Sequence, residues 1–284
     1  MAEHTEKIVV IGSGVMGRGI AHVAAMSGHH ATMVDRDETI LDGAMAQVRA
    51  NLDKGVALGK VSEETRETTL ANLQTSTSYV EASTDAALVV EAVPEVMELK
   101  REIFQTLGEV TQDTCILATN TSSLSVTEIA AAAHRPERVI GAHFFNPVHV
   151  RVLLEIVMAQ QTSDETLSGL KRIGERMSRE MIVVQDTPGF ATSRLGLALG
   201  LEAIRMVEAG VASAEDIDRG MQLGYVHPMG PLKLTDWVGL DTRLKIAEYL
   251  YQELDTDTFR PPALLRQMVE EGKLGRKSGQ GFYT

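Results

Sequence analysis

Residues 139–147 read VIGAHFFNP, so that one histidine, His143, lies in an apolar run that ends at Asn146-Pro147. A histidine in such a run is often a core residue whose ring nitrogens bind backbone groups. At the end of a buried strand, an imidazole can also serve as a general base, because it exchanges a proton near neutral pH. The choice between these interpretations depends on what surrounds the ring.

A partner for His143 follows from the position of the next apolar run, LLEIV. If residues 139–145 and 152–157 form an antiparallel pair that turns around His149, then Glu155 lies directly opposite His143 on the same face. A carboxylate bound to one ring nitrogen fixes the tautomer and makes the other nitrogen a better base. The spacing therefore predicts a His–Glu pair that removes a hydroxyl proton, with a purely structural pair as the alternative.

A glycine-rich loop near the start of the chain has the spacing of a dinucleotide-binding motif. The stretch IVVIGSGVMGRGI contains G-x-G-x-x-G directly after a predicted strand and at the start of a predicted helix. The first glycine permits a tight turn, the second lets a pyrophosphate approach the backbone, and the third lets helix and strand pack closely. A glycine-rich turn without a ligand is the alternative. The residues expected to bind the cofactor here are Gly12, Ser13, Gly14, Val15, Met16 and Gly17.

Asp35 ends the second predicted strand, ATMVD. In this position a carboxylate can accept a hydrogen bond from the ribose 2′-hydroxyl of NAD, and it would repel the 2′-phosphate of NADP. The cofactor predicted from this residue is NAD. Arg36 beside it is the residue that could bind a 2′-phosphate instead.

A polar cluster, ATNTSSLSVTEIA, follows a further predicted strand and begins a helix. The carboxyl ends of the strands form the ligand crevice of an open α/β sheet, so that Asn120, Ser122 and Ser123 are candidates for binding a ligand. Helix capping is the alternative for these hydroxyls, and Ser125 with Glu128 fits a capping box.

The elements that must position these residues alternate between strands and helices in the first part of the chain. Runs such as AALVVEAV and CILATN suit parallel strands buried on both faces, and Ser62 is a candidate N-cap of one of the helices between strands. This alternation predicts an α/β fold with a Rossmann-type doubly wound sheet. We expect an NAD-binding domain at 1–187, followed by an all-helical domain for substrate binding and dimerisation at 188–284.

The second domain is predicted to contain helices only. Its first helix is apolar on more than one side, which indicates burial against two surfaces and favours a homodimer through this domain. Phe190, Leu197, Leu201 and Ile204 form one stripe of that helix, and Leu195, Leu199 and Met206 lie outside it. The expected helices are 190–209, 214–223, 231–254 and 262–271.

The composition limits the possible partners. The 284 residues carry a net charge of −12, which argues against nucleic acid or an anionic membrane as a partner. The start of the chain lacks the pattern of a signal peptide, and no apolar run approaches the ~20 residues that cross a bilayer. Cys115 is the only cysteine, which fits a reducing cytoplasm, and its strand context TCILAT indicates core packing. We expect no metal site.

The motifs IGSGVMGRGIA, VVEAVPE, NTSSLS, GAHFFNP, LLEIV and DTPGF together resemble the 3-hydroxyacyl-CoA dehydrogenase family, and within it the single-function 3-hydroxybutyryl-CoA dehydrogenases. The resemblance extends from about Lys7 to Tyr283. It implies NAD-dependent oxidation of a (3S)-3-hydroxyacyl-CoA to the 3-ketoacyl-CoA, or the reverse reduction. By position, it implies a catalytic pair at His143 and Glu155 and a hydroxyl-binding serine at Ser122. It also implies cofactor contacts from Asp35, Glu95, Lys100, Asn146 and Lys277 and a CoA contact from Lys54.

The chain departs from the family pattern after PGF. The family continues with two residues and then Asn-Arg, and its asparagine helps to hold the thioester side of the substrate. This chain reads PGFATSRL, so that Ser193 takes the place of the asparagine beside Arg194. A serine is shorter and has one donor where the amide has two, but it can still bind a carbonyl directly or through water. The departure leaves the exact substrate open.

Two other functions are consistent with the nucleotide-binding half of the sequence. One is a dehydrogenase of a free hydroxy acid, of the carnitine or gulonate type. The other is a nucleotide-binding protein without turnover, against which the predicted pair of His143 and Glu155 argues.

Overall fold

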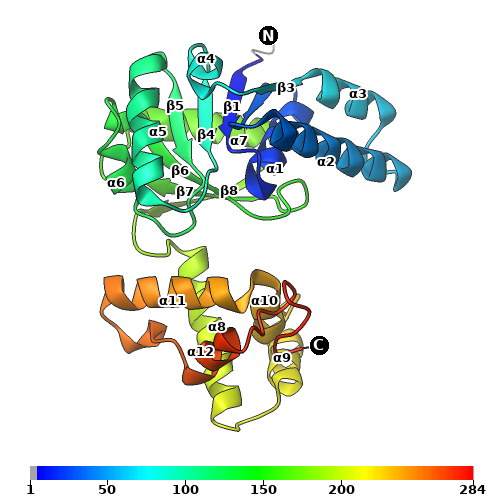
Figure 1. The fold of residues 1–284 in the computed structure, drawn as a ribbon, viewed down its shortest axis with the longest axis vertical. Helices are drawn as coiled ribbons and strands as arrows, with labels where there is room; N and C mark the ends of the chain where they lie inside the picture. Colours follow the sequence, from blue (N-terminus) through cyan, green and yellow to red (C-terminus); the bar gives the residue numbers. More distant parts are fainter. Residues whose placement is uncertain (1–4, 284) are drawn as a thin grey trace. The chain divides into compact units, whose positions relative to one another are not determined.

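The computed structural model describes residues 5–283, and the chain divides into two compact units (Figure 1). The first unit extends through Asp186, and the second begins at Thr187. The sequence predicts the division one residue later, within the segment DTPGF. The change from mixed to purely helical structure occurs at the same place.

An eight-stranded sheet is the frame of the first unit. The strands are β1 (Lys7–Ile11), β2 (His30–Val34), β3 (Leu73–Ser76), β4 (Leu88–Glu91), β5 (Ile116–Thr119), β6 (Val139–Phe144), β7 (Leu153–Met158) and β8 (Glu180–Gln185). Their order is β3-β2-β1-β4-β5-β6-β7-β8, and the first six in sequence are parallel to one another. Strand β7 is antiparallel to β6, and β8 is parallel to β7. The order reverses between β1 and β4, which confirms the predicted doubly wound sheet.

Helices connect these strands. They are α1 (Val15–Met26), α2 (Glu38–Ala57), α3 (Glu63–Ala71), α4 (Tyr79–Ser83), α5 (Met97–Val110), α6 (Val126–Ala130), a 3₁₀ turn (Pro136–Arg138) and α7 (Asp164–Arg176). The predicted N-cap of α3 is confirmed, because the Ser62 hydroxyl accepts a hydrogen bond from the Thr65 N–H at 3.0 Å. Ser125 likewise caps α6 by accepting from the Glu128 N–H at 3.2 Å. The Glu128 carboxylate binds Arg101 at 2.8 Å.

The two faces of the sheet differ in chemistry. One face is apolar, and its side chains form a core with residues of α1, α2 and α7. On the other face, Glu91 pairs in register with Thr119, Thr119 with Gly141, and His143 with Glu155. Because residues two positions apart on a strand share a face, all of these residues lie on the same face. The ionisable side chains of these central strands therefore lie on one face of the sheet.

The edge strands β3 and β8 are absent from the sequence prediction. Strand β3 reads LQTS and has one buried side chain, that of Leu73. Strand β8 reads EMIVVQ, and its residues are exposed or half-buried. An edge strand has a neighbour on one side only, so that β3 need not show the apolar run of a central strand, and the apolar run MIVV of β8 stays exposed or half-buried.

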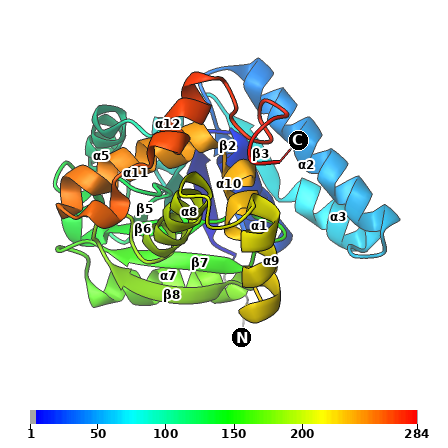
Figure 2. The ribbon, with the colours of Figure 1, turned by 90° about the horizontal axis from the view of Figure 1, so that it is seen from below.

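The second unit is built around α8 (Thr192–Glu208), which every other helix of the unit contacts (Figure 1 and Figure 2). These helices are α9 (Ala214–Gly224), α10 (Pro231–Val238), α11 (Leu240–Leu254) and α12 (Ala263–Glu270), with a 3₁₀ turn at Asp257–Phe259. Leu197, Leu201 and Ile204 of the predicted stripe are buried on α8, whereas Leu195 is 72% exposed. Phe190 is also buried, but it precedes the helix and has a φ of 50°, so that its assignment to the helix is wrong. None of the helices within residues 5–283 is long and apolar enough to cross a bilayer.

The prediction of one helix over 231–254 is wrong. Gly239 separates α10 from α11, and its φ of 102° lies in a region that glycine adopts far more readily than other residues. Helical periodicity correctly predicts a helix on each side of the glycine, but it does not show the break between the two helices.

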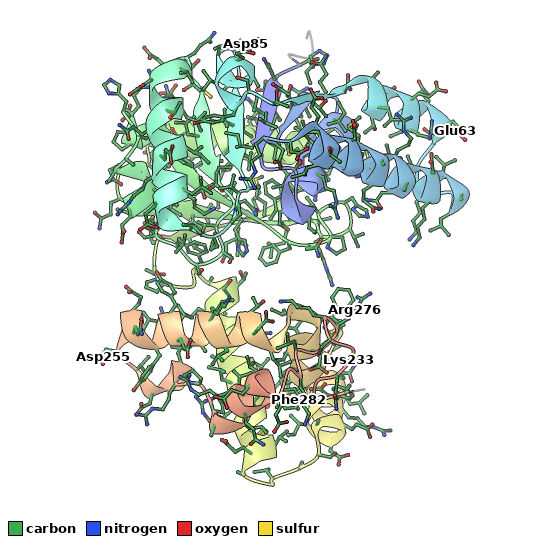
Figure 3. All side chains as sticks on the ribbon, viewed as in Figure 1. Glu63, Asp85, Lys233, Asp255, Arg276 and Phe282 are labelled. Carbon is green, nitrogen blue, oxygen red and sulfur yellow. The ribbon has the colours of Figure 1, made fainter. Side chains whose placement is uncertain are left out.

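The C-terminal segment folds against α9 and α10. The carboxylate of Asp236 accepts hydrogen bonds from the backbone N–H groups of Phe282 and Tyr283, both at 2.9 Å. The Tyr283 hydroxyl donates to the buried carboxylate of Asp218 at 2.7 Å. The Arg276 guanidinium lies 4.6 Å from the centre of the Trp237 ring. Figure 3 labels Arg276 and Phe282 among the side chains of this unit.

Candidate active site

The glycine loop has the geometry that its spacing predicts. Gly12 has a φ of 93°, and a Cβ on it would lie 2.7 Å from the carbonyl oxygen of Ala92. A Cβ on Gly17 would lie 1.7 Å from the carbonyl oxygen of Gly12, so that the close approach of helix and turn depends on this glycine. A Cβ on Gly14 would have no atom within 4 Å. The open side of the loop therefore lies at Gly14, where a ligand can approach the backbone and the N-terminus of α1.

A cleft of about 740 Å³ adjoins this loop, at the carboxyl ends of β1, β2 and β4. Its walls combine apolar side chains with one carboxylate and one guanidinium. The lining includes Gly12, Gly14, Val15, Met16, Asp35, Arg36, Ile40, Tyr79, Pro94 and Leu99. Apolar walls beside a glycine loop and a carboxylate at a strand end suit the adenosine and pyrophosphate of a dinucleotide. The residues present therefore fit NAD.

Asp35 and Arg36 both line this cleft, next to the glycine loop. The Asp35 carboxylate accepts hydrogen bonds from the backbone N–H and the hydroxyl of Ser13, both at 2.9 Å. The contact holds the end of β2 against the loop that follows β1. Recognition of a ribose by Asp35 stays a prediction.

His143 and Glu155 face each other across β6 and β7, in the register predicted from their spacing. His143 Nδ1 lies 2.8 Å from Glu155 Oε2, and the two side chains are 9% and 0% exposed. The ring of Phe145 packs with its centre 4.5 Å from that of His143. A neutral imidazole has one donor nitrogen and one acceptor nitrogen. When Nδ1 donates to the carboxylate, Nε2 is the acceptor, as a general base requires.

The polar loop after β5 is connected to the strand that carries His143. The side-chain oxygen of Asn120 accepts a hydrogen bond from the Phe144 N–H at 2.9 Å. Half-buried Ser122 lies two residues further on. Its backbone N–H donates to Glu95 Oε1 at 3.0 Å. Two of the predicted polar residues thus link the loop to its surroundings through Phe144 and Glu95.

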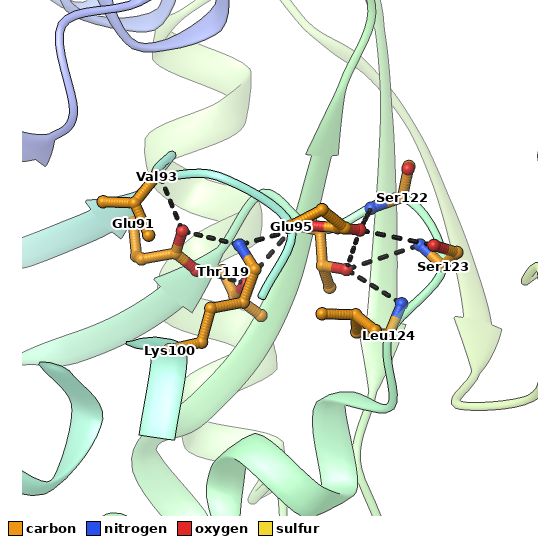
Figure 4. A network of polar contacts seen from close by, with 9 residues as sticks. Glu91, Val93, Glu95, Lys100, Thr119, Ser122, Ser123 and Leu124 are labelled. Carbon is orange, nitrogen blue, oxygen red and sulfur yellow. Dashed lines mark hydrogen bonds and ion pairs between the residues drawn. The ribbon is translucent and has the colours of Figure 1, made fainter. Parts of the chain in front are cut away.

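A buried network of charged groups lies behind this loop (Figure 4). Lys100 on α5 donates to Glu91 Oε1 at 2.7 Å and lies 3.3 Å from Glu95 Oε2. The hydroxyl of Thr119 donates to Glu91 Oε2, and that of Thr121 donates to Glu95 Oε1, at 2.7 and 2.6 Å. The side chains of Lys100 and Glu91 are 1% and 0% exposed. Such full burial is rare for these residue types unless they are paired.

The pKa of Glu95 reflects this network. Burial disfavours its ionised form, but the Lys100 ammonium and the hydrogen bonds from the loop outweigh that effect and hold the pKa of this carboxyl below its usual range. The predicted contacts of Glu95 and Lys100 with the cofactor stay predictions. Glu91 and Thr119 were not predicted from the sequence. For Glu91 there was a signal, because a glutamate that ends an apolar strand, as in the motif VVEAVPE, is unusual enough to indicate a buried polar contact.

A smaller pocket of about 270 Å³ lies between α1, α2 and the turn after β6. Val15 lines both this pocket and the larger cleft. The polar lining residues are Arg18, Gln47, Asn51, Asn146 and His149. Of the predicted contacts, Asn146 therefore lies in this pocket, and Lys54 is exposed in the last turn of α2. Arg18 and Asn51 are not among the residues that the sequence singled out.

The remaining predicted contacts belong to the second unit. Lys277 donates to Asp241 Oδ1 and to the hydroxyl of Thr242, both at 2.9 Å. Ser193 is half-buried in the first turn of α8. The roles predicted for Lys277 and Ser193 stay predictions.

Cys115 is buried, and burial raises the pKa of its thiol to about 12. It therefore packs in the core, as its strand context predicts, and is not a reactive thiol at neutral pH. Within residues 5–283, no three His, Cys, Asp or Glu side chains are grouped to hold a metal ion.

Comparison with known proteins gives matches over the whole chain. Residues 7–187 match the family model of the NAD binding domain of 3-hydroxyacyl-CoA dehydrogenase, and residues 189–284 match the model of its C-terminal domain. A relative from Deinococcus radiodurans, named probable 3-hydroxybutyryl-CoA dehydrogenase, is 43% identical over 277 residues, which cover 98% of this chain and 99% of that protein.

Solved structures show the same similarity. The crystal structure of FadB2 from Mycobacterium tuberculosis has a TM-score of 0.95 at 40% identity, covering 99% of both chains. The crystal structure of (S)-3-hydroxybutyryl-CoA dehydrogenase PaaH1 from Ralstonia eutropha has a TM-score of 0.95 at 38% identity, again with 99% of both chains covered.

Proposed function

The chain belongs to the 3-hydroxyacyl-CoA dehydrogenase family and is an NAD-dependent oxidoreductase, and we propose that it acts on short (3S)-3-hydroxyacyl-CoA thioesters such as 3-hydroxybutyryl-CoA. The reaction turns the 3-hydroxyl group into a ketone, or runs in reverse. The main support for this proposal is the buried pair of His143 and Glu155, whose Nδ1 and Oε2 atoms are 2.8 Å apart. The pair belongs to the same sheet whose strands β1, β2 and β4 end at the cleft beside the glycine loop.

His143 acts as the general base. Its Nε2 accepts the proton of the 3-hydroxyl group, while the bond between C3 and its hydrogen breaks and C3–O becomes a double bond. NAD, when bound, accepts the hydride that leaves C3. Glu155 stabilises the imidazolium that forms and keeps the ring in one orientation. Ser122 donates its hydroxyl hydrogen to the substrate oxygen as negative charge develops there.

The cofactor contacts that we propose lie mainly in the first unit. Val15 begins α1 without an acidic side chain in its first turn, so that the helix N-terminus favours the pyrophosphate. Asp35 accepts a hydrogen bond from the adenosine ribose, which favours NAD over NADP. Further contacts are assigned by family resemblance to Glu95, Lys100, Asn146 and Lys277.

The CoA portion of the substrate is assigned to the region of the smaller pocket and α2. Arg18 and the amides of Gln47 and Asn51 supply donors there for phosphate or amide oxygens. Lys54, one turn after Asn51, adds a cation at the exposed end of the helix. Ser193 is assigned to the thioester side.

We also infer that the protein is a cytoplasmic homodimer that assembles through the second unit. Large apolar side chains are exposed on this unit, which favours contact with another protein surface. They include Leu195, Val211, Leu223, Tyr225 and Val226, each at least 62% exposed. Light scattering at micromolar concentration gives the mass of a dimer if this inference is right, and the mass of a monomer contradicts it.

A turnover panel tests the proposed function. The formation of NADH is followed by absorbance with 3-hydroxyacyl-CoA esters of increasing chain length, and with NADP in place of NAD. Free 3-hydroxybutyrate is the matched control, because it carries the same reacting carbon without CoA. We expect the highest kcat/KM with a short ester and NAD. Equal turnover of the free acid would favour the hydroxy-acid alternative, and equal use of NADP would assign Arg36 to the phosphate.

A further inference from the structure

Glu91 binds three donors and lies outside the set of residues that line the cleft. Its Oε1 accepts hydrogen bonds from the Val93 N–H and from Lys100 Nζ, both at 2.7 Å, and its Oε2 accepts from Thr119. The side chain is fully buried on the face of the sheet that also holds His143. A buried carboxylate with this set of partners fixes the positions of the groups around it.

The best-connected of these partners is Lys100, which is also in contact with Glu95. The Glu95 Oε1 atom in turn accepts from the Thr121 hydroxyl and from the Ser122 N–H, at 2.6 and 3.0 Å (Figure 4). The Thr121 hydroxyl also accepts a hydrogen bond from the Leu124 N–H at 2.9 Å, which connects the two ends of the segment that contains Ser122. The polar contacts thus run without interruption from a buried strand end to the backbone of Ser122.

We propose that Glu91 is a positioning residue of the reaction, which holds Lys100 and Glu95 and through them the loop that presents Ser122 to the substrate. The inference rests on the role of Ser122 given under the proposed function. A hydroxyl group stabilises developing charge only when it is held at the right distance and angle, and a displacement of about 1 Å is enough to lose much of that effect.

The test compares Glu91→Gln, Ser122→Ala and the variant with both changes. Glutamine keeps the volume of Glu91 and removes its charge, so that Lys100 loses its strongest partner. We expect Ser122→Ala to lower kcat about 10- to 100-fold, since it removes a donor to a charged oxygen. Glu91→Gln is expected to lower kcat by a similar or smaller factor. In the double variant, kcat should lie within about twofold of Ser122→Ala, because both changes remove the same interaction.

A second variant separates positioning from stability. Glu91→Gln leaves the Lys100 ammonium buried with one carboxylate, so that the variant can be unstable. Combining it with Lys100→Met removes both charges, and we expect this pair of changes to recover the thermal stability that Glu91→Gln loses. Because Lys100 is also an assigned cofactor contact, kcat is measured at saturating NAD, and the kcat of the pair should remain low because Glu95 still lacks its holding partner. Where Glu91→Gln does not yield folded protein, this pair takes its place in the comparison with Ser122→Ala.

The matched control is Glu128→Gln. Glu128 on α6 binds Arg101 on α5, the residue after Lys100, at 2.8 Å. The change therefore breaks an ion pair between neighbouring helices at an exposed position, without touching the contacts of Glu95. We expect kcat within about twofold of the unmodified protein.

Two results would overturn the inference while the role of Ser122 stands. One is a folded Glu91→Gln/Lys100→Met protein with full kcat. The other is a kcat in the Glu91→Gln/Ser122→Ala variant that falls by the product of the two separate factors, which indicates independent effects. An unchanged kcat in Ser122→Ala would overturn the inference together with the role of Ser122. A loss of activity in His143→Gln, measured in the same assay, would show that the rest of the proposed function still stands.

Discussion

Two buried charged clusters on one face of the sheet differ in how the chain brings them together. His143 and Glu155 belong to adjacent strands of one antiparallel pair. Glu91, Lys100 and Glu95 come from the end of a strand, a helix and the segment between them. The first cluster depends on the register of one turn, and the second depends on how α5 packs beside the strands.

The two clusters also differ in what their chemistry allows. An imidazole exchanges a proton near neutral pH, whereas the ordinary pKa values of lysine and glutamate lie far from it. The His–Glu pair is therefore suited to move a proton, and the Glu–Lys–Glu cluster is suited to hold a fixed shape. Burial of charge is therefore no evidence of catalysis by itself, because the residue type decides what a buried cluster can do.

The largest effect is expected for the residue that moves the proton. His143→Gln should lower kcat by about 10²- to 10⁴-fold, the usual contribution of a positioned general base. NADH binding, measured by fluorescence, should be retained, because the change does not touch the glycine loop. A His143→Gln enzyme with more than a tenth of the original kcat would remove the distinction between the two clusters.

A substitution of Lys100 tests the Glu–Lys–Glu cluster through its effect on the stability of the protein. Lys100→Met leaves the buried Glu91 and the adjacent Glu95 without their cation, and we expect the free energy of unfolding to fall by about 3–5 kcal/mol. Without that cation, burial raises the pKa of Glu95, so that the variant should recover stability as the pH falls and the carboxylate takes up a proton. Urea unfolding at several pH values measures both effects. A loss that grows towards acid pH would contradict the assignment.

His22 shows what burial does to an ionisable group without a polar partner. Both of its ring nitrogens lack a hydrogen bond, and burial, with a smaller effect of His149, lowers its pKa to about 4. The unfolded chain binds a proton near pH 6.5 and the folded chain does not, so that stability falls as the pH drops from about 6.5 to about 4. The loss amounts to at most about 3 kcal/mol. It should shrink in His22→Leu and persist in His30→Gln, a change at an exposed histidine.

Glu155 should have a smaller effect on turnover than His143, because it assists the proton transfer without receiving the proton. Glu155→Gln removes a charged hydrogen bond worth about 1.5–3 kcal/mol, so that kcat should fall by about 10- to 100-fold. An unchanged kcat in Glu155→Gln would mean that the carboxylate only orients the ring, since the amide oxygen of glutamine can also accept the Nδ1 hydrogen bond.

The smallest effect is expected at Ser193. Its hydroxyl can make one good bond to a neutral thioester oxygen, worth about 0.5–1.5 kcal/mol, so that Ser193→Ala should reduce kcat/KM for the acyl-CoA about 2- to 15-fold. Cofactor affinity should stay the same. An unchanged kcat/KM with lower thermal stability would show that Ser193 only supports the first turn of α8.

The sequence was sufficient to predict the site elements that depend on short spacing. The glycine loop, the N-cap of α3 and the pairing of His143 with Glu155 all involve residues within one turn, one helix end or one hairpin. Their geometry follows from local rules, since the side chains of strands alternate and helix termini need capping groups. The buried stripe of α8 follows from helical periodicity in the same way.

What escaped prediction depends on how a helix packs against the sheet, on contacts between separate segments, or on single backbone angles. Nothing in the spacing of Glu91 and Lys100 shows that α5 carries the lysine into the sheet face, or that Thr119 completes the set. The break at Gly239 depends on one φ angle within a continuous apolar pattern. Of the two edge strands, β3 lacks an apolar run, and the apolar run MIVV of β8 is exposed or half-buried, because an edge strand has a neighbour on one side only.

The bonds of Asp236 to Phe282 and Tyr283 make the stability of α10 depend on a segment about 46 residues further along the chain. The Tyr283 hydroxyl extends this dependence to Asp218 on α9. A protein shortened to residues 1–281 leaves both carboxylates without these donors, so that its helical unit should open locally and become sensitive to protease while the sheet unit stays resistant. Equal protease resistance of the shortened and the 284-residue protein would contradict this consequence.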